Sequence, residues 1–142
     1  LPLERPSARD FALREKSDGK PTELASQLAT LVLFDFVTGN WDRWSGGNVG
    51  YVRETRRVIF VDNDGAFFDP VPKEALARQL AIVKALEFLP ARFIDAAAAL
   101  DAEKLTSALG EERAGTPLLS ESVQRGVLDR LATVTQLSAL RR

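Results

Sequence analysis

Apolar residues recur along the chain with two different spacings, which separate the segments expected to be helical from those expected to be strands. Over residues 22 to 38 the apolar positions follow a helical repeat, with Leu28 and Leu31 on one face. Thr22 suits the N-cap of this helix, and Gly39 suits the position just past its end. The apolar residues become almost continuous toward the end of the segment, which is typical of a helix buried on most sides.

The next apolar segments, NVGYV and RRVIFVD, are rich in β-branched and aromatic residues and are separated by the charged tripeptide RET. This pattern predicts a β-hairpin that follows a polar loop over residues 40 to 48 and ends in the turn DNDG. An amphipathic helix is then expected in KEALARQLAIVKALEF, stopping before Pro90. Two or three further helices are expected over the rest of the chain, at roughly residues 91–99, 101–109 and 120–139.

The first 21 residues contain three Pro, one Gly and many charged residues, which predicts an extended arm or linker over residues 1–21. Residues 22–142 would then form one domain, a size that allows a sizeable core. The expected fold class is mainly α with a small β-hairpin, and most of the polar chemistry lies at the two ends of that hairpin.

Composition restricts the chemistry available to the chain. Its 142 residues are 45% hydrophobic and 27% charged, with a net charge of -1, so no overall field favours nucleic acid or an anionic membrane. The chain has no Cys and no His, which excludes disulfides, thiolate or imidazole metal sites and a Ser-His-Asp triad. No apolar run is long enough to span a bilayer. Catalysis would therefore depend on carboxylates, amides, hydroxyls, Lys and Arg.

Three polar residues flank the expected hairpin: Asp42 and Asn48 precede it, and Asp62 closes it. Because an antiparallel hairpin brings its two ends together, these side chains are expected to converge. Two carboxylates and an amide carbonyl suit a hard cation such as Mg²⁺, or Mn²⁺ in its place. Such a cation completes its coordination with nucleotide phosphates, while the remaining carboxylate orients a hydroxyl.

The order of an Asp, an Asn, a hairpin and a second Asp near a Gly is also the catalytic order of protein kinases. The segment DFVTGNWDRWSGGN, followed by FVDNDGAFF, resembles the C-terminal lobe of atypical kinases related to four-jointed and the Golgi secretory-pathway kinases. It is similar, more distantly, to HipA-like and phosphoinositide-kinase-like proteins. The resemblance extends over about residues 20–140, and its specific motifs lie within residues 35–68.

The resemblance implies a role for each matching residue. Asp42 would be the catalytic Asp, and Arg43 beside it would brace the loop. Asp62 would bind metal with Asn48. The residues that would support or shape the catalytic loop and the metal-binding turn are Asn40, Asn63 and Gly65. The turn DNDG is one residue longer than the family's DNG, so the choice between Asp62 and Asp64 as metal ligand stays open.

The neighbouring aromatic residues have two interpretations. Trp41 and Trp44 would serve either as a stacking platform for a sugar or base, or as packing for the loop, which we favour. The pair Phe67 and Phe68 is interpreted as core beneath the metal-binding turn.

Residues 1–21 lack the strands, the glycine-rich loop and the Lys–Glu pair of a kinase N-lobe. The expected function is therefore the catalytic lobe of an ATP-dependent kinase whose N-lobe comes from elsewhere, with the isolated chain inactive. The alternative is a non-catalytic, pseudokinase-like interaction domain. Either would leave an apolar face that favours association with itself or with a partner chain. The phosphoryl acceptor and the compartment stay open, with the cytoplasm favoured.

Overall fold

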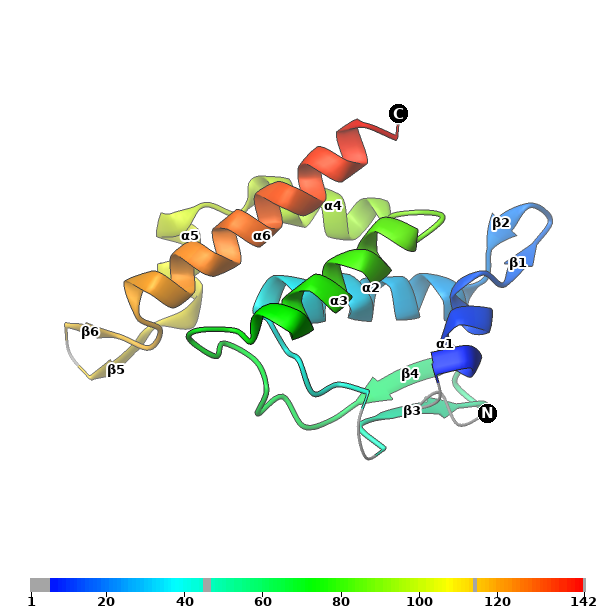
Figure 1. Ribbon diagram of the computed structural model, residues 1–142, viewed down its shortest axis with the longest axis horizontal. Helices are drawn as coiled ribbons and strands as arrows, with labels where there is room; N and C mark the ends of the chain where they lie inside the picture. Colours follow the sequence, from blue (N-terminus) through cyan, green and yellow to red (C-terminus); the bar gives the residue numbers. More distant parts are fainter. Residues whose placement is uncertain (1–5, 45–46, 114, 142) are drawn as a thin grey trace.

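Helix α2 (Glu23–Thr38) lies at the centre of the molecule, as its nearly continuous apolar sequence predicts (Figure 1). Thr22 caps its start, because the Thr22 Oγ1 accepts a hydrogen bond from the amide of Ala25 at 3.2 Å. Gly39 ends it in a left-handed conformation, with a φ of 70°, that glycine adopts without steric cost. Both predicted boundaries are confirmed. This computed structural model describes residues 6–44, 47–113 and 115–141.

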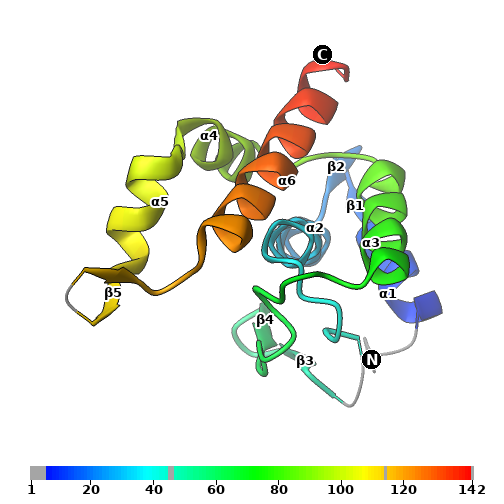
Figure 2. The same ribbon diagram turned by 60° about the vertical axis from the view of Figure 1, so that its left-hand side comes forward.

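The other long helices pack on two sides of α2. They are α3 (Lys73–Ala85), α4 (Ala91–Ala99), α5 (Ala102–Leu109) and α6 (Glu121–Ala139). Figure 2 looks nearly along α2 and shows α3 on one side of it and α4, α5 and α6 on the other. Helix α2 contacts α3 and α6, and α6 contacts α4 and α5. The predicted helices are confirmed, although α3 ends earlier than expected because Leu86 leaves helical geometry and packs into the core.

The core lies between these helices and contains aliphatic residues from each of them. Its most enclosed members come from the middle of α2 and the inner faces of α3 and α6: Leu28, Ala29, Leu33, Val83 and Val134. Their complete burial explains why α2 carries apolar residues almost all round.

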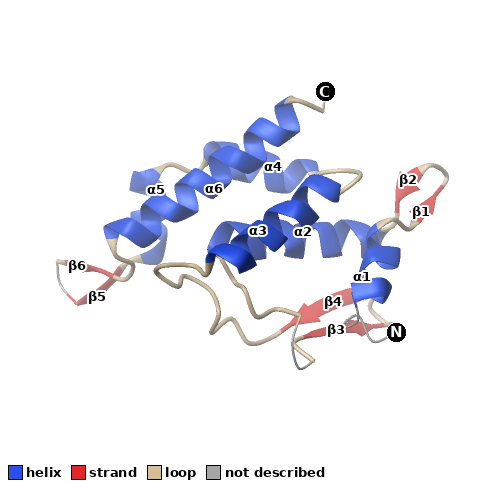
Figure 3. Cartoon of the chain, viewed as in Figure 1, coloured by secondary structure: helices blue, strands red, loops and turns tan. Residues whose placement is uncertain are grey.

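The predicted β-hairpin is confirmed and lies along α2 (Figure 3). Its antiparallel strands are β3 (Val49–Val52) and β4 (Arg57–Phe60), with Val49 opposite Phe60. Gln27 of α2 anchors the second strand, because its side-chain amide donates to the Arg56 carbonyl at 2.8 Å and accepts from the Val58 amide at 2.8 Å. The hairpin is thus held to the central helix by polar bonds that sequence spacing does not reveal.

The prediction of an extended arm over residues 1–21 is wrong for its described part; residues 1–5 lie outside the described residues. The segment folds as helix α1 (Pro6–Leu13) and a small hairpin of β1 (Lys16–Ser17) and β2 (Lys20–Pro21). Helix α1 packs on α2 and contributes Leu13 to the core. The hairpin turn uses Asp18 and Gly19, with φ angles of 52° and 74°, and such a pair is a strong hairpin signal.

A second unexpected strand pair joins α5 to α6. Strand β5 (Glu111–Arg113) runs antiparallel to β6 (Thr116–Pro117). With helix making up 55% of the described residues, the mainly helical fold class is confirmed.

Candidate functional site

The loop that carries Asn40, Asp42 and Arg43 begins where α2 ends. The amide of Asn40 donates to the Asp35 carbonyl at 2.8 Å, which turns the chain sharply back against the helix. Gly39 sits close to α3's leading loop: a Cβ at this position would lie 2.7 Å from Val71 Cγ2. The loop is therefore fixed to the C-terminal end of the central helix.

Gln79 of α3 holds the same loop from the other side. Its side-chain amide donates to the carbonyl oxygens of Asn40 and of Asp35, the latter at 3.4 Å. Asn40 is almost completely buried and its Oδ1 accepts from the Asp42 amide at 3.3 Å. Asn40 thus supports the loop, and Asp42 follows it in a half-buried position.

The acidic turn of residues 62–65 leaves the end of β4. Asp62 adopts a left-handed backbone conformation, with a φ of 59°, which is unusual for a residue with a side chain. Its Oδ1 accepts a hydrogen bond from the Asp64 amide at 3.2 Å. The turn ends where the Phe67 amide donates to the Thr38 carbonyl at 2.8 Å, which ties it to the last residue of α2.

The loop and the turn touch each other at Gly65. A Cβ added at Gly65 would lie 2.7 Å from Asn40 Oδ1 and 3.2 Å from Asp42 Cβ. Gly65 is buried, whereas Asp62, Asn63 and Asp64 are exposed. The fold therefore brings Gly65 of the acidic turn so close to the Asp42 loop that no side chain would fit between them.

Arg43 joins the two segments through the interior and is only 1% exposed. Its Nε and Nη2 donate to the carboxylate of Asp35 at 3.0 to 3.1 Å. Its Nη1 donates to the carbonyl oxygens of Val61 at 2.6 Å and Asp62 at 3.1 Å. Its Nη2 also donates to Asn63 Oδ1. One guanidinium thus links α2 to the start of the acidic turn.

Burial dominates the electrostatics of this pair. Burial raises the pKa of the Asp35 carboxyl to about 6, because the hydrogen bonds and charge of Arg43, which lower it, offset only part of the rise. The guanidinium also lies over the Phe60 ring, with Cζ 5.1 Å from the centroid, so an aromatic face covers it. Asp35 is therefore mostly ionised at neutral pH and paired with Arg43.

Asn48 lies between the hairpin and the Asp42 loop. Its backbone carbonyl accepts from the Val61 amide at 3.0 Å, which extends the β3–β4 pairing beyond the strands. Its side-chain amide donates to the Asp42 carbonyl at 3.4 Å. These two bonds join Asn48 to both the Asp42 loop and the end of β4, whereas the convergence of the Asp42, Asn48 and Asp62 side chains stays a prediction.

The donor atoms at these positions fit a hard cation. Asp62 and Asp64 offer carboxylate oxygens at the surface and Asn48 an amide, which suits Mg²⁺ or Mn²⁺ better than a soft metal. Among the described residues, no three acidic, His or Cys side chains are grouped so that they could hold a metal ion. A cation here would depend on few protein ligands and on water or phosphate oxygens for the rest.

The aromatic residues divide between packing and exposure. Trp44 packs against the core, and Arg9 of α1 lies 5.1 Å from its ring centroid. Phe67 also packs against the core, whereas Phe68 is exposed, so only half of the expected core pair lies in the core. Trp41 is 44% exposed and meets Phe68 edge-on, at a centroid distance of 6.5 Å.

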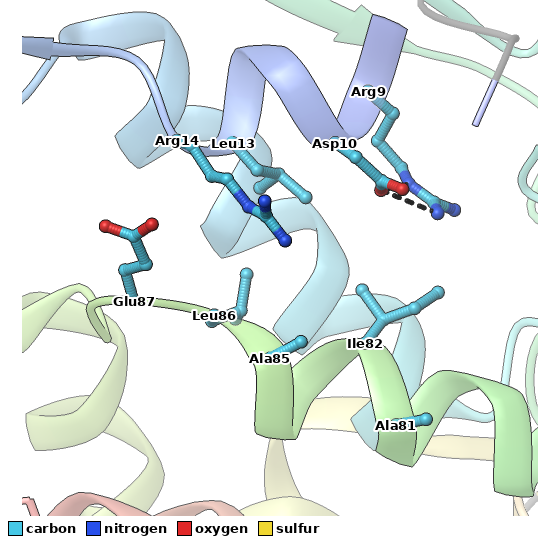
Figure 4. Close-up of a pocket in the computed structure, with 9 residues that line it drawn as sticks. All are labelled: Arg9, Asp10, Leu13, Arg14, Ala81, Ile82, Ala85, Leu86 and Glu87. Carbon is cyan, nitrogen blue, oxygen red and sulfur yellow. Dashed lines mark hydrogen bonds and ion pairs between the residues drawn. The ribbon is translucent and has the colours of Figure 1, made fainter. Parts of the chain in front are cut away.

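A separate groove lies between α1 and α3 and has a volume of about 240 Å³ (Figure 4). Leu13, Ile82 and Leu86 form its apolar part, and Arg14 and Glu87 stand at its edge. None of the residues expected at the catalytic site lines this groove.

Sequence analysis also missed Asp35 and Gln79 as parts of the site. Asp35 has a recognisable signal, because a carboxylate within a buried apolar helix requires a cationic partner, and Arg43 follows closely. Gln79 has no such signal in the sequence, since it lies on an amphipathic helix that is distant in sequence from the Asp42 loop.

Comparisons with protein families, with curated proteins and with solved structures find no match to this chain. Over the part of the chain that is described, no helix is both long and apolar enough to cross a membrane.

Proposed function

We propose that this chain is the catalytic lobe of an ATP-dependent phosphotransferase that transfers the γ-phosphoryl group of ATP to a hydroxyl acceptor. Asp42 orients the acceptor hydroxyl and receives its proton. Asp62 and Asn48 hold Mg²⁺ or Mn²⁺, with Asp64 as the alternative carboxylate. The metal neutralises charge on the phosphates, and Arg43 acts as a positioning residue.

The contact at Gly65 carries the proposal. It sets the backbone of the Asp42 loop against the Asp62 turn, with a Cβ at Gly65 only 3.2 Å from Asp42 Cβ. Phosphoryl transfer needs a carboxylate for the hydroxyl and a separate carboxylate for the metal, held in fixed relation. The Arg43 bonds to the Val61 and Asp62 carbonyls supply that fixed relation.

The proposed reaction needs a second lobe to cover the nucleotide, supplied from outside these 142 residues. A glycine-rich cover and a Lys for the phosphates would come from it. The phosphoryl acceptor is then a protein or a small molecule that reaches Asp42.

Thermal unfolding of the chain tests the metal–nucleotide half of the proposal. We expect Mg²⁺ and ATP together, and neither alone, to raise the Tm by several degrees, because a ligand that binds only the folded state stabilises it. Asp62→Ala should abolish the rise. Asp95→Ala on α4, an exposed Asp away from the loops, is the matched control and should keep it. A rise that persists in Asp62→Ala would contradict the assignment of Asp62.

Phosphoryl transfer, assayed with the covering lobe present, tests the catalytic half. We expect Asp42→Ala to lower kcat by at least about a hundredfold, the usual contribution of a positioned acid–base group. Far-ultraviolet circular dichroism should show the same helix content as the parent chain. Turnover equal to that of the parent would eliminate Asp42 as the catalytic carboxylate.

The second candidate function is a non-catalytic, pseudokinase-like interaction domain. It is favoured by large apolar side chains exposed beside the site: Ile59 is 50%, Val61 55% and Phe68 53% exposed. Contiguous exposed apolar surface marks association sites, and Ile59 and Val61, two positions apart at the end of β4, would project from the same face of the hairpin. Light scattering should then detect self-association that Ile59→Lys reduces. A monomer at every concentration tested would count against self-association.

A further inference from the structure

Asp35 is a charged residue, and the proposed function gives it no role. It stands near the end of α2 among buried apolar residues and is 2% exposed. A helix that needed only to pack would carry an apolar residue there, because a buried ion pair rarely stabilises a fold more than apolar side chains of similar volume. The carboxylate is therefore expected to specify a geometry.

That geometry is the orientation of Arg43. The Asp35 carboxylate receives hydrogen bonds from Nε and Nη2, along one edge of the guanidinium. Because the guanidinium is planar and rigid, fixing this edge also fixes the direction of the remaining nitrogen, Nη1. Nη1 then meets the carbonyl oxygens of Val61 and Asp62.

The turn that Arg43 holds needs such support. Asp62 and Phe67 are both non-glycine residues in the left-handed region, with φ angles of 59° and 58°. Conformations of this kind persist only where surrounding contacts impose them. At Asp62 these contacts are the bond from Arg43 to its carbonyl oxygen and the bond that the Asp64 amide donates to its Oδ1, and of the two only the Arg43 bond joins the turn to α2.

We propose that Asp35 is a positioning residue which, by orienting Arg43, fixes the acidic turn and thereby the place of the Asp62 carboxylate. The inference rests on the proposed function, since that function makes Asp62 the metal ligand. Asp35 touches neither substrate nor metal in this role and acts only through Arg43.

Hydrogen exchange measured by NMR on the metal-free chain tests the proposal. The reporters are the amides of Val61, Ala66 and Phe67, which donate to Asn48, Asn63 and Thr38. In Asp35→Asn we expect these amides to exchange about tenfold faster or more relative to amides in the middle of α6, because losing a charged hydrogen-bond partner opens the turn locally.

Thr38→Val is the matched control. Thr38 is also buried near the end of α2, and among the described residues its hydroxyl bonds only to the Phe34 and Asp35 carbonyls of the same helix. Its own carbonyl, which accepts from the Phe67 amide, is kept in the variant. Thr38→Val should change exchange at the turn and in α6 by the same factor. If Asp35→Asn also changes the exchange rates at the turn and in α6 by the same factor, the proposal is overturned.

A measurement on the parent chain covers the case in which Asp35→Asn does not fold. In low urea, the amides of Val61, Ala66 and Phe67 should open with one common free energy and one common urea dependence, as a unit released by one clamp. If these amides open independently, with different free energies, then Asp35 and Arg43 do not hold the turn as one unit and the proposal is refuted.

Binding of Mg²⁺ with ATP separates this inference from the proposed function. Local opening in Asp35→Asn, combined with no ligand stabilisation of the parent chain, would keep the clamp and reject the phosphotransferase. Ligand stabilisation of the parent chain, combined with unchanged local exchange in Asp35→Asn, would keep the phosphotransferase and reject the clamp. If both hold, Asp35→Asn should also weaken the stabilisation by Mg²⁺ and ATP.

Discussion

Arg43 shows how much a single residue does at the centre of this molecule. Its guanidinium bonds to a carboxylate, two backbone carbonyls and a side-chain amide while lying almost wholly in the interior. The resemblance of the sequence to kinases implied a bracing role for Arg43, but not the partner. Asp35 is that partner: a carboxylate in an apolar helix signals the need for a cation, and the fold shows that Arg43 supplies it.

At the residue scale, Asp35 is expected to make stability depend on pH. Its pKa is raised in the folded chain from 3.8 to about 6, so the protonated form favours folding. The contribution of Asp35 protonation to the free energy of unfolding is fully present below pH 3.8 and is lost as the pH rises through about 6. Compared with Asp35→Asn, the parent chain should therefore gain about 2 kcal/mol of unfolding free energy as the pH falls from about 7 to 4.

Urea unfolding of the two proteins at a series of pH values measures this difference, because other titrating groups largely cancel in the comparison. A difference that stays constant across the range would show that burial does not raise this pKa. A difference that moves the opposite way would mean that Arg43 outweighs burial.

At the element scale, the decisive contact is the one between the Asp42 loop and the acidic turn. It depends on Gly65, because any side chain there meets Asn40 and Asp42. The sequence identified Gly65 as a turn residue. What the fold adds is that the missing Cβ makes room for another segment.

Gly65→Ala should lower the free energy of unfolding by about 1–3 kcal/mol, the usual effect of overpacking, since the new methyl group would lie 2.7 Å from Asn40 Oδ1. Chemical denaturation followed by circular dichroism provides the measurement. The control is Gly50→Ala on β3, where a Cβ meets nothing within 4 Å. Equal stability of both variants would show that the loop and the turn are not in tight contact.

At the scale of the whole molecule, the N-terminal segment belongs to the packed structure. Helix α1 places Ala12 and Leu13 in the core, and the Lys16 ammonium pairs with the Glu87 carboxylate at 2.6 Å. Because this ion pair is exposed, the apolar contacts of α1 are expected to contribute most of its stabilisation.

Leu13→Ala should therefore destabilise the chain by about 2–4 kcal/mol, as large-to-small core substitutions do. Phe11→Ala on the same helix is the control, because Phe11 is 72% exposed and its removal should cost little. Thermal or urea unfolding compares the two. If Leu13→Ala is as stable as Phe11→Ala, α1 is not part of the cooperative unit.

Local sequence determined the elements of this protein. Apolar spacing, Thr22 and Gly39 predicted α2, and the two β-branched segments predicted the hairpin, because such signals depend on neighbours within one or two turns. The position of Asp42 before the hairpin and Asp62 after it predicted that their side chains converge, which stays a prediction. A short helix such as α1 was missed because few apolar residues mark it, and its stability comes from packing on α2.

Tertiary structure alone decided the partners. The pairing of Asp35 with Arg43, the approach of Gln79 from α3 and the contact of Gly65 with Asn40 all join segments that the sequence leaves independent. Their physical cause is burial: once α2 is enclosed, its one interior carboxylate needs a cation, and that cation's other hydrogen bonds hold the acidic turn.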